Sequence, residues 1–420
     1  MISQRSDHSH DSTILKDLVK RIQDLSALPI QQTRQERWIR SNSVQRRNQS
    51  PRPPVYAALY LFDESFENGI LKPQVECENP DLQPVELSLK HILVRQELIP
   101  DDIPVQPPEW IVPRKISGYR DWGLQPKYHG AVPYSGGSFY IDPVIHIPSD
   151  LDKLKIADLV YDEQTTLRQF DRFQDLIGQQ MTVKLGGLGA SVNLMQCWTN
   201  LRGVENTLLD MIADPEFLHH GIEIMAEGYR CWYTQAEKMN ILDSGVREIF
   251  ATDDLPKPGY RPDRVRLCDQ MVFVEAQELT GVSPQMHEEF AIRYEKPLAE
   301  MFGLTSYGCC EDLTEKIEQV ATIANLRQIG VTPFADVTKC AERIRERFVI
   351  SWRPSPVMLT DPFDEENIRR SIRSGLEVLK ANHCSFHIFL KDIHSCSGHP
   401  ERLTRWTQIV NEEVTRLWGE

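Results

Sequence analysis

The sequence lacks the features that mark exported and membrane proteins. Its 420 residues contain no run of about 18 apolar residues, and the polar start MISQRSDHSHDSTILKDLVK has no apolar stretch of the secretory type. Its nine cysteines are an odd number without the spacing of a disulfide framework. We therefore expect a cytoplasmic protein with reduced cysteines and no membrane partner.

The sequence also lacks an excess of positive charge, because 47 Lys and Arg residues stand against 61 Asp and Glu residues and give a formal net charge of −14. Such a chain has no overall field that attracts nucleic acid. The arginines between residues 34 and 52 are interpreted as a solvated helix face rather than a nucleic-acid arm. No nucleic-acid partner is expected, and the sequence leaves a homo-oligomer open.

Common metal and nucleotide motifs are missing as well. The chain has no C-x-x-C pair and no H-E-x-x-H motif. The run GGLGAS (186–191) lacks both the Walker lysine and the dinucleotide pattern G-x-G-x-x-G. Its glycines are interpreted as a tight turn or as backbone space for a ligand.

The second half of the chain alternates short apolar runs with amphipathic helices, which is typical of repeated βα units. Asp214-Pro215, Ser283-Pro284 and Asp364 are helix start signals. With one strand near residue 55, the pattern predicts an α/β fold, the (β/α)8 TIM barrel, and a doubly wound open sheet is the alternative. The eight predicted strands are 55–62, 181–187, 246–252, 271–277, 304–309, 326–333, 347–354 and 386–392.

The N-terminal part is predicted to elaborate one barrel domain that spans residues 13–420. Residues 1–12 are polar and are expected to be disordered, and an amphipathic helix should begin near Ser12. Residues 80–148 are rich in proline, glycine and aromatic residues. We expect them to form an insertion, partly strand, that covers the barrel mouth.

Ionisable side chains and thiols follow six successive predicted strands. Because parallel strands all end on one side of a barrel, these groups should converge on one mouth. Asp254, Glu278 and Asp336 are predicted to orient the substrate or exchange protons with it, and Arg353 and Lys391 to bind an anionic substrate group. His129, in the covering segment, should reach the ligand from above. The alternative is that these groups form structural ion pairs.

The run YGCCED (307–312) carries two adjacent thiols, which on a strand would point to opposite sides, so only one should face the mouth. Thiolate and imidazole ligands favour zinc, whereas two cysteines at a strand end can also be packing residues or vicinal thiols. The candidate metal ligands are Cys309, Glu311, Asp392, His394 and Cys396.

Four runs of the sequence resemble the uroporphyrinogen decarboxylase-like superfamily, with a likeness that extends from about Ile14 to the C-terminus. They are AQELTGVSPQMHEEF, FGLTSYGCCEDL, LRQIGVTPFADV and LKDIHSCSGHPERLTRW. The resemblance implies the TIM barrel. The arginine-rich motif of the porphyrinogen decarboxylases is missing after the first strand, where the sequence reads LFDESFENG.

The resemblance therefore points to the methyltransferase branch, whose members act with corrinoid proteins and hold zinc through His-x-Cys and a second cysteine. Here Tyr307-Gly308-Cys309 matches the cysteine but not the histidine. The leading hypothesis is zinc-assisted methyl transfer between a small methylated substrate and a corrinoid protein or another acceptor. The alternatives are a metal-free decarboxylase or lyase for a small carboxylated substrate, and a barrel that only binds a ligand.

Overall fold

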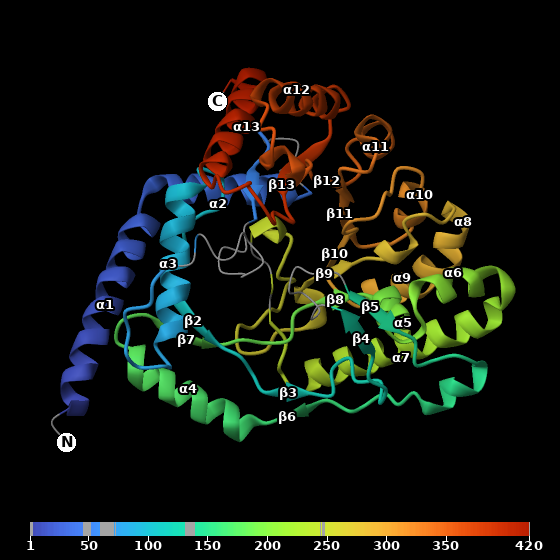
Figure 1. Ribbon diagram of the computed structural model, residues 1–420, viewed down its shortest axis with the longest axis horizontal. Helices are drawn as coiled ribbons and strands as arrows, with labels where there is room; N and C mark the ends of the chain where they lie inside the picture. The colour runs from blue at the N-terminus through green and yellow to red at the C-terminus, as the bar shows by residue number, and fades with distance from the viewer. Residues whose placement is uncertain are drawn as a thin grey trace.

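A parallel sheet of seven strands forms the centre of the molecule. The computed structural model describes residues 3–44, 52–58, 71, 73–130, 139–243, 245 and 248–419. The strands follow one another in an arc in Figure 1, and each pairs in parallel with its neighbours. Their order is β1 (Val55–Ala57), β13 (Ser385–Leu390), β12 (Val349–Trp352), β11 (Leu326–Val331), β10 (Leu304–Tyr307), β9 (Met271–Val274) and β8 (Ser191–Val192).

The predicted α/β fold with a parallel sheet is confirmed, but the described residues do not show a closed barrel. Six of the predicted strands lie in this sheet, and residues 59–62 of the first lie outside the described ranges. The segment 181–187 does contain a strand, but the prediction that it belongs to the main sheet was wrong. That segment forms β7 (Thr182–Leu185), which pairs with β2 (Glu109–Val112) in a separate sheet. After the glycines, the chain joins the main sheet as β8.

The strand predicted at 246–252 is also wrong for the residues that the structure describes. Glu248–Phe250 form a short 3-10 turn. Side chains donate hydrogen bonds to the nearby carbonyl oxygens. Asn42 Nδ2 donates to Ile249 O at 2.9 Å and to Ala251 O at 3.0 Å. Gln328 Nε2 also donates to Ile249 O, at 2.7 Å. These bonds satisfy carbonyl groups that a neighbouring strand would otherwise pair.

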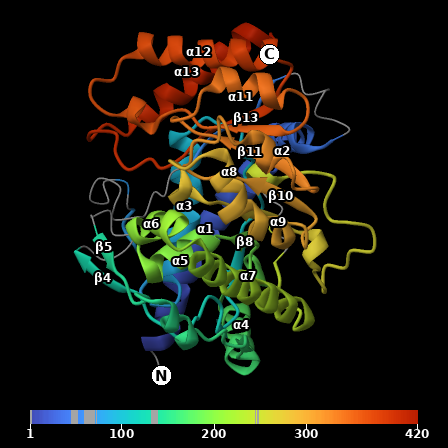
Figure 2. The same cartoon turned by 90° about the vertical axis from the view of Figure 1, so that its right-hand side faces the viewer.

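Side chains alternate across the strands, so the sheet has an apolar and a polar face. Ile350 and Ile388 belong to the main hydrophobic core, against the outer helices. On the other face, Ser351 Oγ lies 2.8 Å from His387 Nε2, although both residues are buried. Helices on the apolar side include α7 (Pro215–Lys238), α9 (Arg293–Ala299), α10 (Ile317–Val320), α11 (Val337–Ile344), α12 (Glu365–Ala381) and α13 (Glu401–Trp418) (Figures 1 and 2).

The predicted helix starts are confirmed by their caps. The Asp214 carboxylate accepts from Phe217 N at 3.2 Å at the start of α7, and Asp364 accepts from Asn367 N at 3.0 Å before α12. Ser283 Oγ accepts from Met286 N at 3.2 Å before α8 (Pro284–His287), which continues through a π-helical turn into α9. Each cap satisfies a backbone donor that the first helical turn leaves unpaired.

The N-terminal part forms a second apolar cluster. Helix α1 (Ser3–Ser26) buries the predicted apolar face and packs on α3 (Gln83–Leu98). It begins at Ser3 rather than near Ser12, and Asp11 within it is buried and accepts from Glu78 N at 2.9 Å and Asn79 N at 3.0 Å. The remaining elements include α2 (Pro29–Asn42), β3 (Ile116–Ser117), β4 (Lys127–Gly130), β5 (Phe139–Asp142), β6 (Val160–Tyr161), α4 (Glu163–Ile177), α5 (Leu194–Arg202) and α6 (Val204–Ala213).

The arginines between residues 34 and 52 are not only a solvated helix face. Arg37 and Arg52 both pair with the buried carboxylate of Asp102, the second at 2.7 Å. Asp102 also accepts from Val55 N at 2.8 Å, so this charge cluster fixes the start of β1.

None of the helices in the described ranges is long and apolar enough to cross a membrane.

A buried carboxylate on α13 joins the last two helices. Glu413 is 2% exposed and pairs with Arg373 at 2.9 Å, Arg416 at 3.0 Å and Arg369 at 3.2 Å. The hydrogen bond from Arg373 lowers the pKa of Glu413 to about 2. This carboxylate therefore stabilises the fold fully above its unfolded-state pKa, and the stabilisation is lost as the pH falls toward 2.

We expect Glu413→Gln to lower the free energy of unfolding at pH 7 by about 2 kcal/mol, because three arginines lose a shared anion. Urea unfolding at pH 7, 4 and 3 measures this, and the deficit should shrink as the pH falls. Glu412→Gln is the matched control, since its side chain is 48% exposed and its ion pairs contribute little. An equal loss in both variants would contradict the assignment.

Candidate active site

The carboxyl ends of β8, β9, β10, β12 and β13 bring polar side chains together at one end of the sheet. Asn193, Glu275 and Arg353 directly follow β8, β9 and β12, and Lys391 follows β13. Cys309 comes two residues after the end of β10. Parallel strands place these positions on the same side of the sheet.

Two thiols and an ammonium group lie in direct contact. The Sγ atoms of Cys309 and Cys310 are 3.6 Å apart, and Lys391 Nζ lies 3.3 Å from the first and 3.4 Å from the second. The prediction that only one thiol could face the mouth was wrong. Strand β10 ends at Tyr307, and Gly308 has a φ of 102°, so the cysteines lie in a turn without strand alternation.

This arrangement favours a thiolate at Cys310. The hydrogen bond from Cys309 lowers the pKa of Cys310 to about 7, and Lys391 acts in the same direction. The same hydrogen bond raises the pKa of Cys309. At neutral pH the pair therefore carries a substantial share of one negative charge on Cys310, beside the Lys391 ammonium. A thiolate is the nucleophilic form of cysteine.

Two carboxyl groups after β9 accompany the thiols. Burial raises the pKa of Glu278 to about 7, and the negative charges of Glu275 and Glu311 add to this. Burial also raises the pKa of Glu275, against hydrogen bonds from Cys309 and Asn193. Glu278 can therefore carry a proton at neutral pH, as a general acid must. We call Glu275, Glu278, Cys309, Cys310 and Lys391 the acid-thiol cluster.

Hydrogen bonds tie the loop of Glu278 to the turn of the thiols. Thr280 Oγ1 accepts from Asp312 N at 3.0 Å, and Lys316 Nζ donates to the carbonyl oxygens of Leu279 at 2.7 Å and Thr280 at 2.9 Å. Lys316 is only 3% exposed, so these contacts are shielded from water. The acid and the thiols are thus held on one connected support.

Arg353 was predicted to bind substrate and Glu311 to bind a metal. Both side chains instead form hydrogen bonds with backbone groups. Arg353 is 3% exposed and donates to the carbonyl oxygens of Cys309 and of Gly308, the latter at 2.9 Å. Glu311 accepts from Cys309 N at 2.7 Å and from Ala276 N at 3.2 Å. Gly330 leaves room for the guanidinium, because a Cβ there would lie 2.9 Å from Arg353 Nη1. These contacts fix the turn that carries the thiols.

Sequence analysis did not predict Asn193, which contacts Glu275, or Arg120, which contacts Asn193. Asn193 donates from Nδ2 to Glu275 Oε1, and its Oδ1 accepts from Arg120 Nη2 at 2.7 Å. The Arg120 guanidinium lies over the rings of Tyr119 and Tyr229, with distances of 5.3 and 5.4 Å to their centroids. No local pattern marks Arg120, because its loop is far from Glu275 in the sequence.

The structure does not bring Asp254 to the cluster. Its carboxylate accepts from Val44 N at 2.9 Å and from Arg327 at 2.6 Å. Arg327 is near the start of β11, so Asp254 lies at the opposite end of the sheet from the thiols. Asp336 is at the correct end, but its carboxylate caps α11, accepting from Thr338 N at 3.0 Å and Lys339 N at 3.1 Å.

The other predicted site residues differ in their surroundings. His129 stacks on Tyr140 with centroids 4.8 Å apart, within the hairpin of β4 and β5. Asp392 is close to the cluster, with Oδ2 3.0 Å from Lys391 Nζ and 3.8 Å from Cys310 Sγ. His394 is exposed, and Cys396 is buried.

The predicted zinc ligands are not gathered around one point. Within the described ranges, no group of three or more His, Cys, Asp or Glu side chains could hold a metal ion. Glu311 is used by backbone donors, and the Lys391 ammonium occupies the place beside both sulfurs that a cation would take. As arranged, the donor set does not fit zinc, which is usually bound by three or four protein ligands.

We expect Lys391→Met to raise the pKa of Cys310, because the thiolate loses its neighbouring positive charge. The rate of alkylation by iodoacetamide, followed on the peptide that carries Cys310, should fall roughly tenfold at pH 7. Lys339→Met is the control, since Lys339 is exposed and pairs with Glu315. An unchanged pH dependence in Lys391→Met would show that the ammonium does not stabilise the thiolate.

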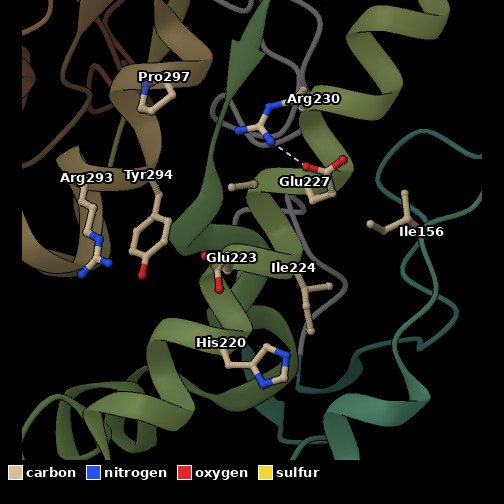
Figure 3. A pocket seen from close by; sticks show the side chains of 10 residues that line it. Ile156, His220, Glu223, Ile224, Glu227, Arg230, Arg293, Tyr294 and Pro297 are labelled. Carbon is tan, nitrogen blue, oxygen red and sulfur yellow. Dashed lines mark hydrogen bonds and ion pairs between the residues drawn. The ribbon is translucent and has the colours of Figure 1, made fainter.

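A separate pocket of about 540 Å³ lies between α7 and α9 (Figure 3). Glu223, Glu227 and Arg230 line it from α7, and Arg293 and Tyr294 line it from α9. Arg230 pairs with Glu227 at 2.6 Å, as the dashed line in Figure 3 marks. No residue of the acid-thiol cluster lines this pocket, so it is not part of the candidate active site.

Comparisons with known proteins give little further information about this chain. No model of a protein family matches the sequence, and no curated protein matches it. Among solved structures, the chain is similar to a methyltransferase from Methanosarcina mazei, with a TM-score of 0.47 and 12% identity over 89% of this chain and 98% of that chain. A similarity of this degree assigns neither a fold family nor an activity.

Proposed function

We propose that the chain is a methyltransferase in which Cys310 accepts a methyl group from a small methylated substrate. The observation that carries the proposal is the contact of Cys310 with Cys309 and Lys391, which lowers the pKa of the Cys310 thiol to about 7. The proposal is supported by the half-buried Glu278, which lies on a loop tied to the same turn and whose pKa is raised to about 7 by burial. A thiolate nucleophile and an acid on one connected support suit displacement at a methyl carbon, because the leaving heteroatom can take up a proton.

In this proposal an electron pair of the Cys310 thiolate forms a bond to the methyl carbon. The bond between that carbon and a substrate oxygen, nitrogen or sulfur breaks, and its electron pair stays on the heteroatom. Glu278 gives its proton to that heteroatom. The products are S-methyl-Cys310 and the demethylated substrate, with no net oxidation or reduction.

Zinc and the corrinoid partner stay predictions of the sequence. Because the donor set does not fit zinc, no step above involves the metal. A corrinoid protein is the proposed acceptor that takes the methyl group from Cys310, and its support is the resemblance of the sequence.

The alternative, decarboxylation of a small carboxylated substrate, is less well supported. It requires Arg353 and Lys391 to bind the substrate carboxylate. Arg353 donates instead to two backbone carbonyl oxygens, and Lys391 is in contact with two thiols. Neither cation is available as that mechanism demands.

The test is to incubate the purified chain with small O-, N- and S-methylated compounds and to map methylation by peptide mass spectrometry. We expect one added methyl group on the peptide with Cys309 and Cys310, lost in Cys310→Ser and kept in the control Cys268→Ser. Turnover of any of these compounds by Cys310→Ser at the wild-type rate, or no methylation of this peptide by any compound, would overturn the proposal.

A further inference from the structure

We infer that Cys309 and Cys310 together form a binding site for neutral, monosubstituted compounds of trivalent arsenic. The ligand class is R–As(OH)2, in which arsenic keeps one organic substituent and exchanges two hydroxyl groups for two protein sulfurs. The inference does not depend on the proposed methyl transfer, because binding consumes no methyl group.

The separation of the two sulfurs suits one shared atom. Trivalent arsenic is pyramidal, so two sulfurs bound at about 2.3 Å, the length of a zinc–sulfur bond, with an angle of about 100° lie about 3.5 Å apart. The Sγ atoms of Cys309 and Cys310 are 3.6 Å apart before any ligand binds. One arsenic atom can therefore join both thiols without a large movement of the turn.

The number of ligands favours an organoarsenical over a metal ion. Within the described part of the chain, no third His, Cys, Asp or Glu joins the pair in a group that could hold a metal. A metal ion bound here would have to fill its remaining positions from solvent. Arsenic in R–As(OH)2 already carries its third substituent, so it needs only the two sulfurs.

Charge also favours a neutral arsenic compound over a metal ion at this site. The Lys391 ammonium lies 3.3 and 3.4 Å from the two sulfurs, so a divalent cation would meet a positive charge at contact distance. A neutral arsenic compound meets no such repulsion. The same ammonium stabilises the thiolate that attacks arsenic first.

The turn is also held before binding. Arg353 donates to the carbonyl oxygens of Gly308 and Cys309, and Glu311 accepts from Cys309 N at 2.7 Å. Both cysteines are partly exposed, so the pair can be reached. Once the first sulfur has bound, the second reacts within the same molecule, and such preorganisation increases affinity.

The reaction balances without an oxidant. Two As–S bonds form and two As–O bonds break, each leaving hydroxyl group takes one proton from a thiol or from water, and two water molecules are released. Where Cys310 starts as a thiolate, the second proton is the one that its thiol had released to solvent, so the sum is two thiols and R–As(OH)2 giving the adduct and two waters. Arsenic remains trivalent throughout. The product is a neutral dithioarsenite ring closed through the backbone of Cys309 and Cys310.

The test uses phenylarsine oxide, which hydrates to this ligand class, with the full chain at equimolar concentration. We expect one phenylarsenic group per chain by native mass spectrometry, kept in excess 2-mercaptoethanol and removed by 2,3-dimercaptopropanol. Cys309→Ser and Cys310→Ser should each weaken binding by at least about a hundredfold, because the second bond is lost. Peptide mapping of the wild-type adduct locates the arsenic even if one variant fails to fold.

Two controls make the outcome specific. Cys384→Ser should bind like the wild type, because Cys384 is a partly exposed cysteine whose neighbouring thiol, Cys340, is buried. Zn²⁺ added beforehand should not protect the wild-type chain. Retention of the adduct by both Cys309→Ser and Cys310→Ser, arsenic on another peptide, no adduct that survives the monothiol, or protection by Zn²⁺ would each overturn the inference.

Discussion

Cys310→Ser is expected to lower kcat/KM for methyl transfer by at least about a thousandfold, because the hydroxyl that replaces the thiolate stays protonated at neutral pH. Cys309→Ser should have a smaller effect. A serine hydroxyl at 309 can still donate a hydrogen bond to Cys310, although its length and direction differ. Steady-state rates with the methylated compound that labels Cys310 measure both variants.

The order of these two losses matters more than their size. If Cys309→Ser lost more activity than Cys310→Ser, Cys309 would be the methyl acceptor and the assignment would have to be reversed. Cys268→Ser is the control, because Cys268 is a partly exposed cysteine outside the cluster. Its rate should equal that of the wild type.

Glu278→Gln is expected to lower kcat by about a hundredfold to ten-thousandfold, the usual range for loss of a general acid. The pH profile gives the sharper test. Because burial raises the pKa of Glu278 to about 7, the wild-type rate should fall above pH 7 as the acid loses its proton. It should fall below pH 7 as the Cys310 thiolate, whose pKa is lowered to about 7, gains one.

The residual activity of Glu278→Gln should therefore still fall below pH 7, the acidic limb of the profile. It should no longer fall above pH 7, the alkaline limb. Glu288→Gln serves as the control, since this exposed residue follows α8 and should not change either limb. An alkaline limb that persists in Glu278→Gln would assign the proton donor to another group. If the rate of Cys310→Ser still fell below pH 7 as in the wild type, the nucleophile would have to be a group other than Cys310.

Strand prediction succeeded where the local pattern carries the information. The runs that became β9 to β13 are short and apolar, and those of β9, β11 and β12 are followed by helices with side-chain caps, so their type and order follow from the sequence alone. The segment 181–187 is equally strand-like, and it does form β7. Its partner β2 lies about 70 residues earlier in the chain, and no local pattern specifies that pairing.

The candidate site, like the strands, could be predicted only in part from the sequence. Cys309, Glu278 and Lys391 could be selected because each follows a predicted strand, and parallel strands end on one side. Their roles were less predictable. Asp254 also follows a predicted strand, but that segment is not a strand in the described residues, and its carboxylate pairs with Arg327 at the other end of the sheet.

What the sequence by itself determined is the alternation of strands and helices, the helix caps and the set of ionisable groups beyond the strands, because these depend on neighbours within a few residues. The tertiary structure decided which of those groups meet. Only the folded chain sets Lys391 against both thiols and links Arg120 through Asn193 to Glu275. Hydrogen bonds and ion pairs act over a few ångströms in space, whereas these partners are up to 155 residues apart in the sequence.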